Sequence, residues 1–294
     1  MARAAAAASR LWTEELPGSR PAQPAPPSIR LRIRIRIDAL PGPPGRDPER
    51  EAAWVVADDE VRMEADGIAL VVRPASGEAE GRVAPGLLEE RPDLFARLLL
   101  ETPVTLAKMT RAQLLHAGAL VGPGGAVVVR GAAGAGKSTL VAAGWRTGLG
   151  VLGDESLLVD RDDPDALEAT LRDLAVTPDG ARLLGLEEAT VPAFSGGEEK
   201  RRVPLFASAR PSDRTARRLA TLLLGPRNPG PARLVSLGPD ELAGLFEAGS
   251  IPQERSFGGD PAPVAAAWGP SRSFRLDGAV DLAGALRIVT DLTR

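Results

Sequence analysis

The chain contains no cysteine, a single histidine and few aromatic residues. Without cysteine it can form neither a disulfide nor a thiolate metal site, and a lone histidine, His116, excludes most zinc arrangements. With 3% aromatic residues, the core has to be built from Ala, Val, Leu and Ile. The sequence also lacks a run of about 20 apolar residues and shows no signal-peptide core near Met1. We therefore expect a cytoplasmic protein with no structural metal and no membrane association.

Neither sign of charge dominates. The 36 basic and 39 acidic residues give a net charge of −3 and a pI near 5.5. This balance argues against a protein whose main task is to neutralise nucleic-acid phosphates, so we expect no nucleic-acid partner. Lysine is scarce among the basic residues, and its three occurrences are Lys108, Lys137 and Lys200.

The N-terminal third is expected to form a separate module. Residues 1–28 are rich in Ala and Pro and lack a periodic apolar face, which predicts a disordered lead. Residues 29–37 alternate Ile or Leu with Arg, a period of two that predicts a strand whose arginines form its solvated face. Further strands are predicted at residues 53–57, 60–65 and 68–73. Residues 29–100 are therefore expected to form a small β-rich module, closed by a helix at residues 87–100.

Residues 101–294 are expected to form the main domain. After a helical stretch near residues 110–115, strands and helices alternate to the end of the chain. Such alternation predicts an α/β domain with a central mixed sheet flanked by helices.

A phosphate-binding loop stands in the middle of this domain. A short apolar run at residues 126–129 predicts a buried strand, and it leads through the motif GxxxxGK[ST] into an apolar helix that begins near Leu140. Glycines allow successive N–H groups to point at phosphate oxygens, while Lys137 reaches the β and γ phosphates and Ser138 coordinates Mg²⁺. We therefore expect ATP and Mg²⁺ as cofactors. The predicted nucleotide-binding residues are Gly131, Ala132, Ala133, Gly134, Ala135, Gly136, Lys137, Ser138 and Thr139.

Two further features flank the loop. Upstream, His116 stands in the sequence Leu-His-Ala-Gly, and downstream Asp154 and Glu155 follow an apparent strand at residues 151–153. A carboxylate at the carboxyl end of a strand lies where α/β proteins place their ligand sites, and it could accept a proton from a hydroxyl group. From the residues alone, the acidic pair could instead lie in a solvated turn, and His116 could be a hydrogen-bonded structural residue.

Together, the three features resemble the C-terminal kinase domain of the HPr kinase/phosphorylase family. In that family a His-x-Gly stretch precedes the loop and an acidic pair follows it. The resemblance extends from about residue 110 to the C-terminus, where residues 281–288 are similar to the family's closing helix. It implies a P-loop kinase-like fold and ATP-dependent phosphorylation of a Ser/Thr-type hydroxyl.

The resemblance also implies roles for single residues. Asp154 would be the base or hydroxyl-orienting group, His116 would lie near the γ-phosphate or the acceptor, and Lys137 would complete the catalytic set. Ser138, Asp154 and Glu155 would be the metal ligands. A homo-oligomer is implied as well.

The acceptor implied by the resemblance is a protein or peptide other than HPr. Ala132 and Ala133 replace polar residues that bifunctional family members often carry, and the glycine-rich segment associated with phosphorylase activity is absent from the sequence. The chain is therefore more similar to the stand-alone kinase-like members.

A competing motif occurs at residues 194–202. Its sequence, Phe-Ser-Gly-Gly-Glu-Glu-Lys-Arg-Arg, resembles the signature loop of ABC and SMC-type ATPases. In those proteins an apolar strand ending in Asp-Glu follows the loop, whereas here the acidic pair precedes it. We interpret the segment as a Gly-Gly turn leading into a basic strand, whose Lys200, Arg201 and Arg202 contact phosphate, an acidic acceptor or solvent.

Two other functions stay open at this point. One is an ABC/SMC-like ATPase or nucleotide-gated switch that acts by assembly, with the loop at Ser195 to Gly197 acting on a second subunit. The other is a nucleotide-binding scaffold without turnover.

Overall fold

The computed structural model describes most of the chain. The described residues are 32–37, 53–57, 60–65, 67–84, 86, 102–169, 174–188, 191–195, 198–203, 215–226 and 228–294. The chain divides into two compact units, residues 1–110 and 111–294, whereas the sequence predicts the boundary between residues 100 and 101. The expected disordered lead and the expected helix at residues 87–100 lie outside the described residues.

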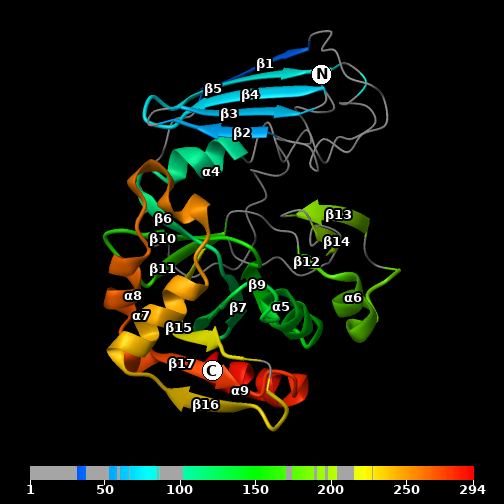
Figure 1. Cartoon of the computed structure of the whole chain (residues 1–294), viewed down its shortest axis with the longest axis vertical. Coiled ribbons are helices and arrows are strands. Elements are labelled where there is room, and N and C mark those ends of the chain that lie inside the picture. Colours follow the sequence, from blue (N-terminus) through cyan, green and yellow to red (C-terminus); the bar gives the residue numbers. More distant parts are fainter. Residues whose placement is uncertain are drawn as a thin grey trace. The chain divides into compact units, whose positions relative to one another are not determined.

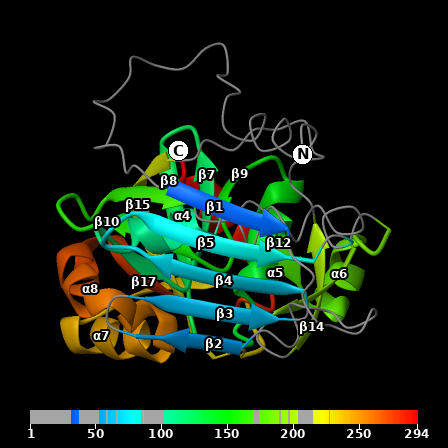
Figure 2. The ribbon, with the colours of Figure 1, turned by 90° about the horizontal axis from the view of Figure 1, so that it is seen from above.

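The N-terminal unit contains a five-stranded sheet in the order β1-β5-β4-β3-β2, which Figure 2 shows side by side. Its elements are β1 (Arg32–Ile37), β2 (Ala53–Val56), β3 (Val61–Ala65), β4 (Ile68–Arg73), β5 (Glu78–Val83) and helix α4 (Thr102–Lys108). All neighbours are antiparallel except β1 and β5. The strands predicted from the sequence are confirmed. On β1, Arg34 is exposed and lies 4.0 Å from Glu80 of β5, as a solvated charged face requires.

The C-terminal unit is built on a mixed sheet of nine strands (Figure 1). Seven follow the order β6-β10-β11-β15-β8-β7-β9, and β17 and then β16 lie beside β15. The strands are β6 (Ala112–Leu115), β7 (Gly118–Gly122), β8 (Gly125–Arg130), β9 (Gly150–Gly153), β10 (Leu157–Asp160), β11 (Ala166–Ala169), β15 (Thr215–Leu224), β16 (Arg233–Ser236) and β17 (Ser273–Asp277). A smaller antiparallel sheet joins β12 (Leu174–Val176), β14 (Glu198–Val203) and β13 (Val191–Ser195).

Helices cover both faces of the large sheet. They are α5 (Lys137–Arg146), α6 (Pro178–Leu184), α7 (Pro239–Ala248), α8 (Ala262–Trp268) and α9 (Leu282–Leu292), with short 3₁₀ turns η3 (Pro252–Gly258) and η4 (Pro270–Arg272). Helices α5 and α9 pack with Val127 and Val129 of β8, and α7 and α8 pack with Ala126 and Val128. Alternate side chains of β8 thus enter two different cores, which is why this strand is apolar throughout. The expected α/β sheet flanked by helices is confirmed.

One element was predicted wrongly. The stretch near residues 110–115 was expected to be helical, but Ala112–Leu115 forms strand β6, paired antiparallel with β10. The apolar run is too short for its period to distinguish helix from strand, and pairing with Leu157 and Leu158 of β10 decides the outcome. Among the residues that the structure describes, no helix is long and apolar enough to cross a membrane.

Candidate functional site

His116, the Gly131–Ser138 loop and the pair Asp154–Glu155 are separate in the sequence but lie together at one edge of the large sheet. By edge we mean the side at which the strand ends lie, here the carboxyl ends of β8 and β15. The parallel strands β8 and β15 end at this edge. Strand β7 runs antiparallel to β8 and begins there, with Gly118 opposite Val129, and β9 ends there, with Gly153 opposite Ala119. His116 therefore precedes β7, the Gly131–Ser138 loop follows β8 and Asp154 follows β9, all at the same edge.

The loop between β8 and α5 has the backbone expected of an anion cradle. Gly134 and Gly136 have φ values of 72° and 103°, in the left-handed region where a side chain would be strained. A Cβ atom on Gly131 would lie 3.1 Å from the Cβ of Leu224, so the loop passes close to β15. Gly136 caps α5 without a side-chain hydrogen bond, which leaves the first N–H groups of the helix to other acceptors.

Lys137 lies inside the loop, and only 6% of it is exposed. Its Nζ donates hydrogen bonds to the carbonyl oxygens of Gly131 at 2.8 Å and Ala132 at 3.2 Å. Burial lowers the pKa of Lys137, while the nearby Asp154 acts in the opposite direction. The loop thus holds a partly desolvated positive charge against its own backbone, close to a carboxylate.

Asp154 is almost fully buried, with 1% of its surface exposed. Its Oδ2 accepts a hydrogen bond of 2.9 Å from the backbone N–H of Ala175 in β12, and its Oδ1 has no hydrogen-bond partner. Burial raises the pKa of Asp154 from 3.8 to about 7, against the lowering effect of the Ala175 N–H; Glu155 raises it further and the hydroxyl of Ser138 lowers it. Asp154 does not lie in a solvated turn, and one of its buried oxygens remains available.

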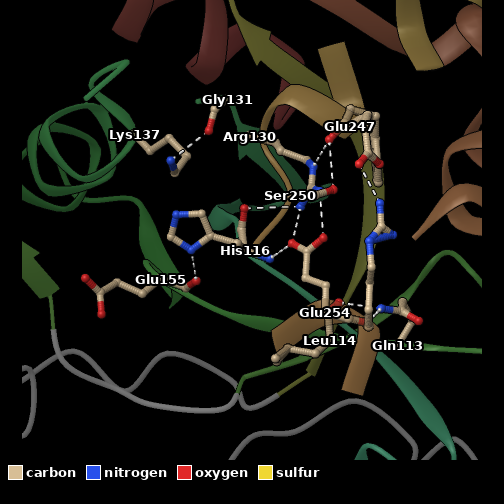
Figure 3. Close-up of polar contacts among 12 residues, drawn as sticks. Gln113, Leu114, His116, Arg130, Gly131, Lys137, Glu155, Glu247, Ser250 and Glu254 are labelled. Carbon is tan, nitrogen blue, oxygen red and sulfur yellow. Dashed lines mark hydrogen bonds and ion pairs between the residues drawn. The ribbon is translucent and has the colours of Figure 1, made fainter. Parts of the chain in front are cut away.

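His116 is held by its backbone and by its ring. Its Nδ1 lies 2.8 Å from the carbonyl oxygen of Glu155. Because a carbonyl can only accept, this contact assigns the proton to Nδ1 and leaves a lone pair on Nε2. Figure 3 shows the ring between Glu155 and Lys137, with its second nitrogen toward the lysine. Burial and the charge of Lys137 lower the pKa of His116, so the neutral form is favoured near neutral pH.

A buried ion pair that was not predicted from the sequence lies next to the backbone of His116. Arg130 and Glu254 are both fully buried, with Nη1–Oε1 and Nη2–Oε2 distances of 2.7 and 2.9 Å. The remaining guanidinium hydrogens bond to the carbonyl oxygen of Phe246, the hydroxyl of Ser250 and the carbonyl oxygen of His116. All five N–H groups of Arg130 are therefore used, and its guanidinium carbon also lies 4.2 Å from the Phe246 ring centroid.

This ion pair positions the backbone on both sides of the site. Glu254 accepts a hydrogen bond from the backbone N–H of His116, while Arg130 directly precedes Gly131 of the loop. The sequence did contain a sign of it, because an arginine that ends an apolar strand must find a partner when it is buried. The partner, 124 residues away, could not be identified from any local pattern.

Lys200 reaches the site from the small sheet. It lies on β14, and its ammonium forms an ion pair with the carboxylate of Glu155. The two side chains are 16% and 29% exposed. The predicted basic strand is confirmed as β14, whereas Gly196 and Gly197 of the competing signature motif lie outside the described residues.

The donor atoms at this edge fit Mg²⁺ bound together with a nucleotide. Among the described residues, no group of three or more His, Asp or Glu side chains could hold a metal ion. Mg²⁺ in nucleotide sites, however, takes only one or two carboxylates in addition to phosphate oxygens and waters. Asp154, with its unpartnered buried oxygen, together with Ser138 and Glu155, provides this type of oxygen donor.

The structure thus brings His116, the Gly131–Ser138 loop, Asp154 and Glu155 to one edge of one sheet, together with Arg130, Glu254 and Lys200. The chain matches no protein-family model, and a comparison with curated proteins finds no relative.

Proposed function

We propose that the C-terminal unit is an ATP- and Mg²⁺-dependent kinase that transfers the γ-phosphate to a Ser/Thr-type hydroxyl of a protein or peptide. The proposal rests above all on Asp154, a buried carboxylate with one unpartnered oxygen beside the lysine of a phosphate-binding loop. It agrees with the resemblance to kinase-like relatives of HPr kinase/phosphorylase. A cytoplasmic location and a homo-oligomer stay predictions.

The residues of the loop would hold the triphosphate. Backbone N–H groups at the start of α5 and the ammonium of Lys137 neutralise phosphate charge, and Lys137 exchanges its backbone acceptors for phosphate oxygens. Ser138, Asp154 and Glu155 would hold Mg²⁺, which when bound supplies further neutralisation of the β and γ phosphates.

Asp154 accepts the proton in the transfer step. The hydroxyl oxygen of the acceptor forms a bond to the γ-phosphorus while the bond to the β–γ bridging oxygen breaks, and ADP leaves with that electron pair. The hydroxyl proton goes to the carboxylate of Asp154. Without metal its pKa is about 7, so the carboxylate is populated at neutral pH and still binds a proton readily.

His116 orients the acceptor. Its Nδ1 proton is engaged by the Glu155 carbonyl, so the Nε2 lone pair can accept a hydrogen bond from the acceptor hydroxyl or from a water molecule. The contacts of its backbone with Arg130 and Glu254 fix the ring relative to the loop.

Phosphoryl transfer can be tested with γ-labelled ATP and a cytosolic extract. Wild-type protein should label an acceptor protein or peptide, and Asp154→Asn should lower the rate by about 10²- to 10⁴-fold while nucleotide still binds. Lys137→Ala should abolish nucleotide binding. Asp179→Asn is the matched control, since Asp179 lies on α6, is exposed and pairs only with a neighbouring arginine in the contacts found for it.

The other functions give different results in the same assay. Equal labelling by wild type and Asp154→Asn would remove Asp154 from the mechanism. Hydrolysis of ATP without transfer of label to any acceptor would favour an assembly-driven ATPase. Intact ATP, with binding abolished by Lys137→Ala, would favour a scaffold.

A further inference from the structure

The ion pair between Lys200 and Glu155 joins two parts of the fold at the site. Lys200 comes from β14 of the small sheet, whereas Glu155 follows β9 of the large one. A second link runs in parallel, because β12 of the small sheet donates the Ala175 N–H to Asp154. The small sheet is thus held against both residues of the acidic pair.

Lys200 also lies within electrostatic range of the groups around the loop. Its charge lowers the pKa of Lys137 and of Asp154. Of the three lysines in the chain, two therefore lie at this edge, and they reach it from different elements. A lysine side chain carries a compact charge on a flexible stem, so its ammonium can move to contact a phosphate group when one binds.

Glu155 cannot serve Lys200 and a divalent cation equally well. A carboxylate that binds Mg²⁺ is largely neutralised, and the metal repels a neighbouring ammonium. A γ-phosphate beside the metal offers that ammonium a new anionic partner.

We propose that Lys200 exchanges partners when the nucleotide binds: its ammonium leaves Glu155 and contacts the γ-phosphate, so that the ion pair keeps the metal-binding carboxylate occupied until ATP and Mg²⁺ arrive. This inference rests on the proposed function, because it requires nucleotide at the loop and metal at Glu155. Because only ATP carries a γ-phosphate, Lys200 would contact bound ATP but not bound ADP.

The first measurement is nucleotide affinity by calorimetry in the presence of Mg²⁺. Lys200→Met should weaken binding of the non-hydrolysable analogue AMP-PNP by about tenfold, the value of a charge-assisted hydrogen bond. Its affinity for ADP should not fall, since ADP lacks the γ-phosphate and the metal no longer competes with the ammonium for Glu155. Lys200→Arg, which keeps the charge, should retain most of the discrimination and guards against misfolding of the methionine variant.

The second measurement is Mn²⁺ binding to the nucleotide-free protein. Lys200→Met should bind Mn²⁺ about three- to fivefold more tightly than wild type, because the competing ammonium has gone. In a Glu155→Gln background the same substitution should give no gain. Arg201→Met is the matched control: Arg201 is the next residue of β14, points to the other face and donates to the carbonyl of Glu187.

The outcomes separate the two proposals. If wild type binds neither nucleotide, the proposed function and this inference both fall. If wild type binds nucleotide, but Lys200→Met lowers the affinities for AMP-PNP and ADP equally or lowers neither affinity, only the proposed exchange of partners is wrong. A gain in Mn²⁺ affinity that persists with Glu155→Gln, or that Arg201→Met reproduces, would also overturn it by showing a general effect of charge.

Discussion

Both edges of the nine-stranded sheet bury an arginine, but among the described residues only the edge with the Gly131–Ser138 loop has a buried carboxylate oxygen without a partner. At the opposite edge Arg218, at the start of β15, is 1% exposed and stacks on Trp268 at 4.7 Å from the ring centroid. It pairs with Asp165, which also binds Arg272 at 2.6 Å. At the loop edge, Arg130 pairs with Glu254 through two hydrogen bonds.

Asp154 makes the difference between the two edges. Its buried Oδ1 has no hydrogen-bond partner. Toward the opposite edge, the described residues leave two buried atoms without a hydrogen bond: the neutral hydroxyl of Ser273, and Nη2 of Arg218, whose charge is still met by Asp165 at 2.8 Å. An unsatisfied carboxylate costs far more than an unsatisfied hydroxyl, so it persists only where something other than stability maintains it. A buried charge by itself therefore says little about function. A buried charge without a partner indicates where a ligand belongs.

The largest effect is expected from breaking the ion pair at the loop edge. Arg130→Met leaves Glu254 buried without a counter-charge and should lower the free energy of unfolding by about 3 to 5 kcal/mol. Chemical denaturation measures this loss. A double variant, Arg130→Met with Glu254→Met, should recover much of the stability, because it removes both charges. Equal destabilisation of the single and double variants would show that lost packing, not the unpaired carboxylate, is responsible.

The second prediction concerns the free energy of unfolding when a buried aspartate is replaced by asparagine. The change should have opposite signs at the two edges. Since the pKa of Asp154 is raised from 3.8 to about 7, the folded state keeps a proton that the unfolded state releases. The stability contributed by the protonated form is complete below pH 3.8 and is lost as the pH rises to about 7. Asp154→Asn should therefore be more stable than wild type by about 2 to 4 kcal/mol at about pH 8, and the gain should shrink toward pH 5.

Asp165→Asn provides the contrast. Burial raises the pKa of Asp165, but Arg272 and Arg218 outweigh it and the pKa is lowered. Its ionised form stabilises the fold, so the asparagine variant should be less stable than wild type at neutral pH, and the loss should fade in acid. Urea denaturation of nucleotide-free protein at several pH values measures both variants. The comparison fails if both substitutions change stability in the same direction at pH 8.

These contrasts also show what the sequence could and could not predict. The strand, loop and helix around Lys137 follow from strong local patterns. The resemblance implied a closing helix at residues 281–288, where the structure has α9 (Leu282–Leu292). The meeting of His116, Asp154 and the loop was implied by the resemblance to the HPr kinase/phosphorylase family, and the position of Asp154 also by its place after a strand. The pairing of Arg130 with Glu254, and the N–H from Ala175 to Asp154, were not expected. Such contacts join segments that are distant in the sequence, and no hydrophobic period or motif indicates which residues will meet.

A smaller effect is expected at the opposite edge. Arg218→Met keeps an apolar contact with Trp268, and Asp165 retains Arg272 and partial access to solvent. The loss should be about 1 to 3 kcal/mol, less than for Arg130→Met. Nucleotide affinity should be unchanged, whereas Arg130→Met should weaken it because the loop and His116 lose their support. Calorimetric titration with nucleotide tests this, and a weakened affinity in Arg218→Met would show that the two edges are coupled.

The smallest effect is expected one residue earlier in the same strand. Arg217 pairs with Asp163 at 2.6 Å, but the two side chains are 51% and 47% exposed. Water and salt screen this pair, so Arg217→Ala should cost no more than about 1 kcal/mol, and the cost should vanish in about 0.5 M NaCl. The loss from Arg218→Met should persist in the same salt, because its guanidinium is shielded from solvent. Denaturation of both variants at low and high salt measures the difference. If both losses respond to salt alike, burial does not distinguish these neighbouring arginines.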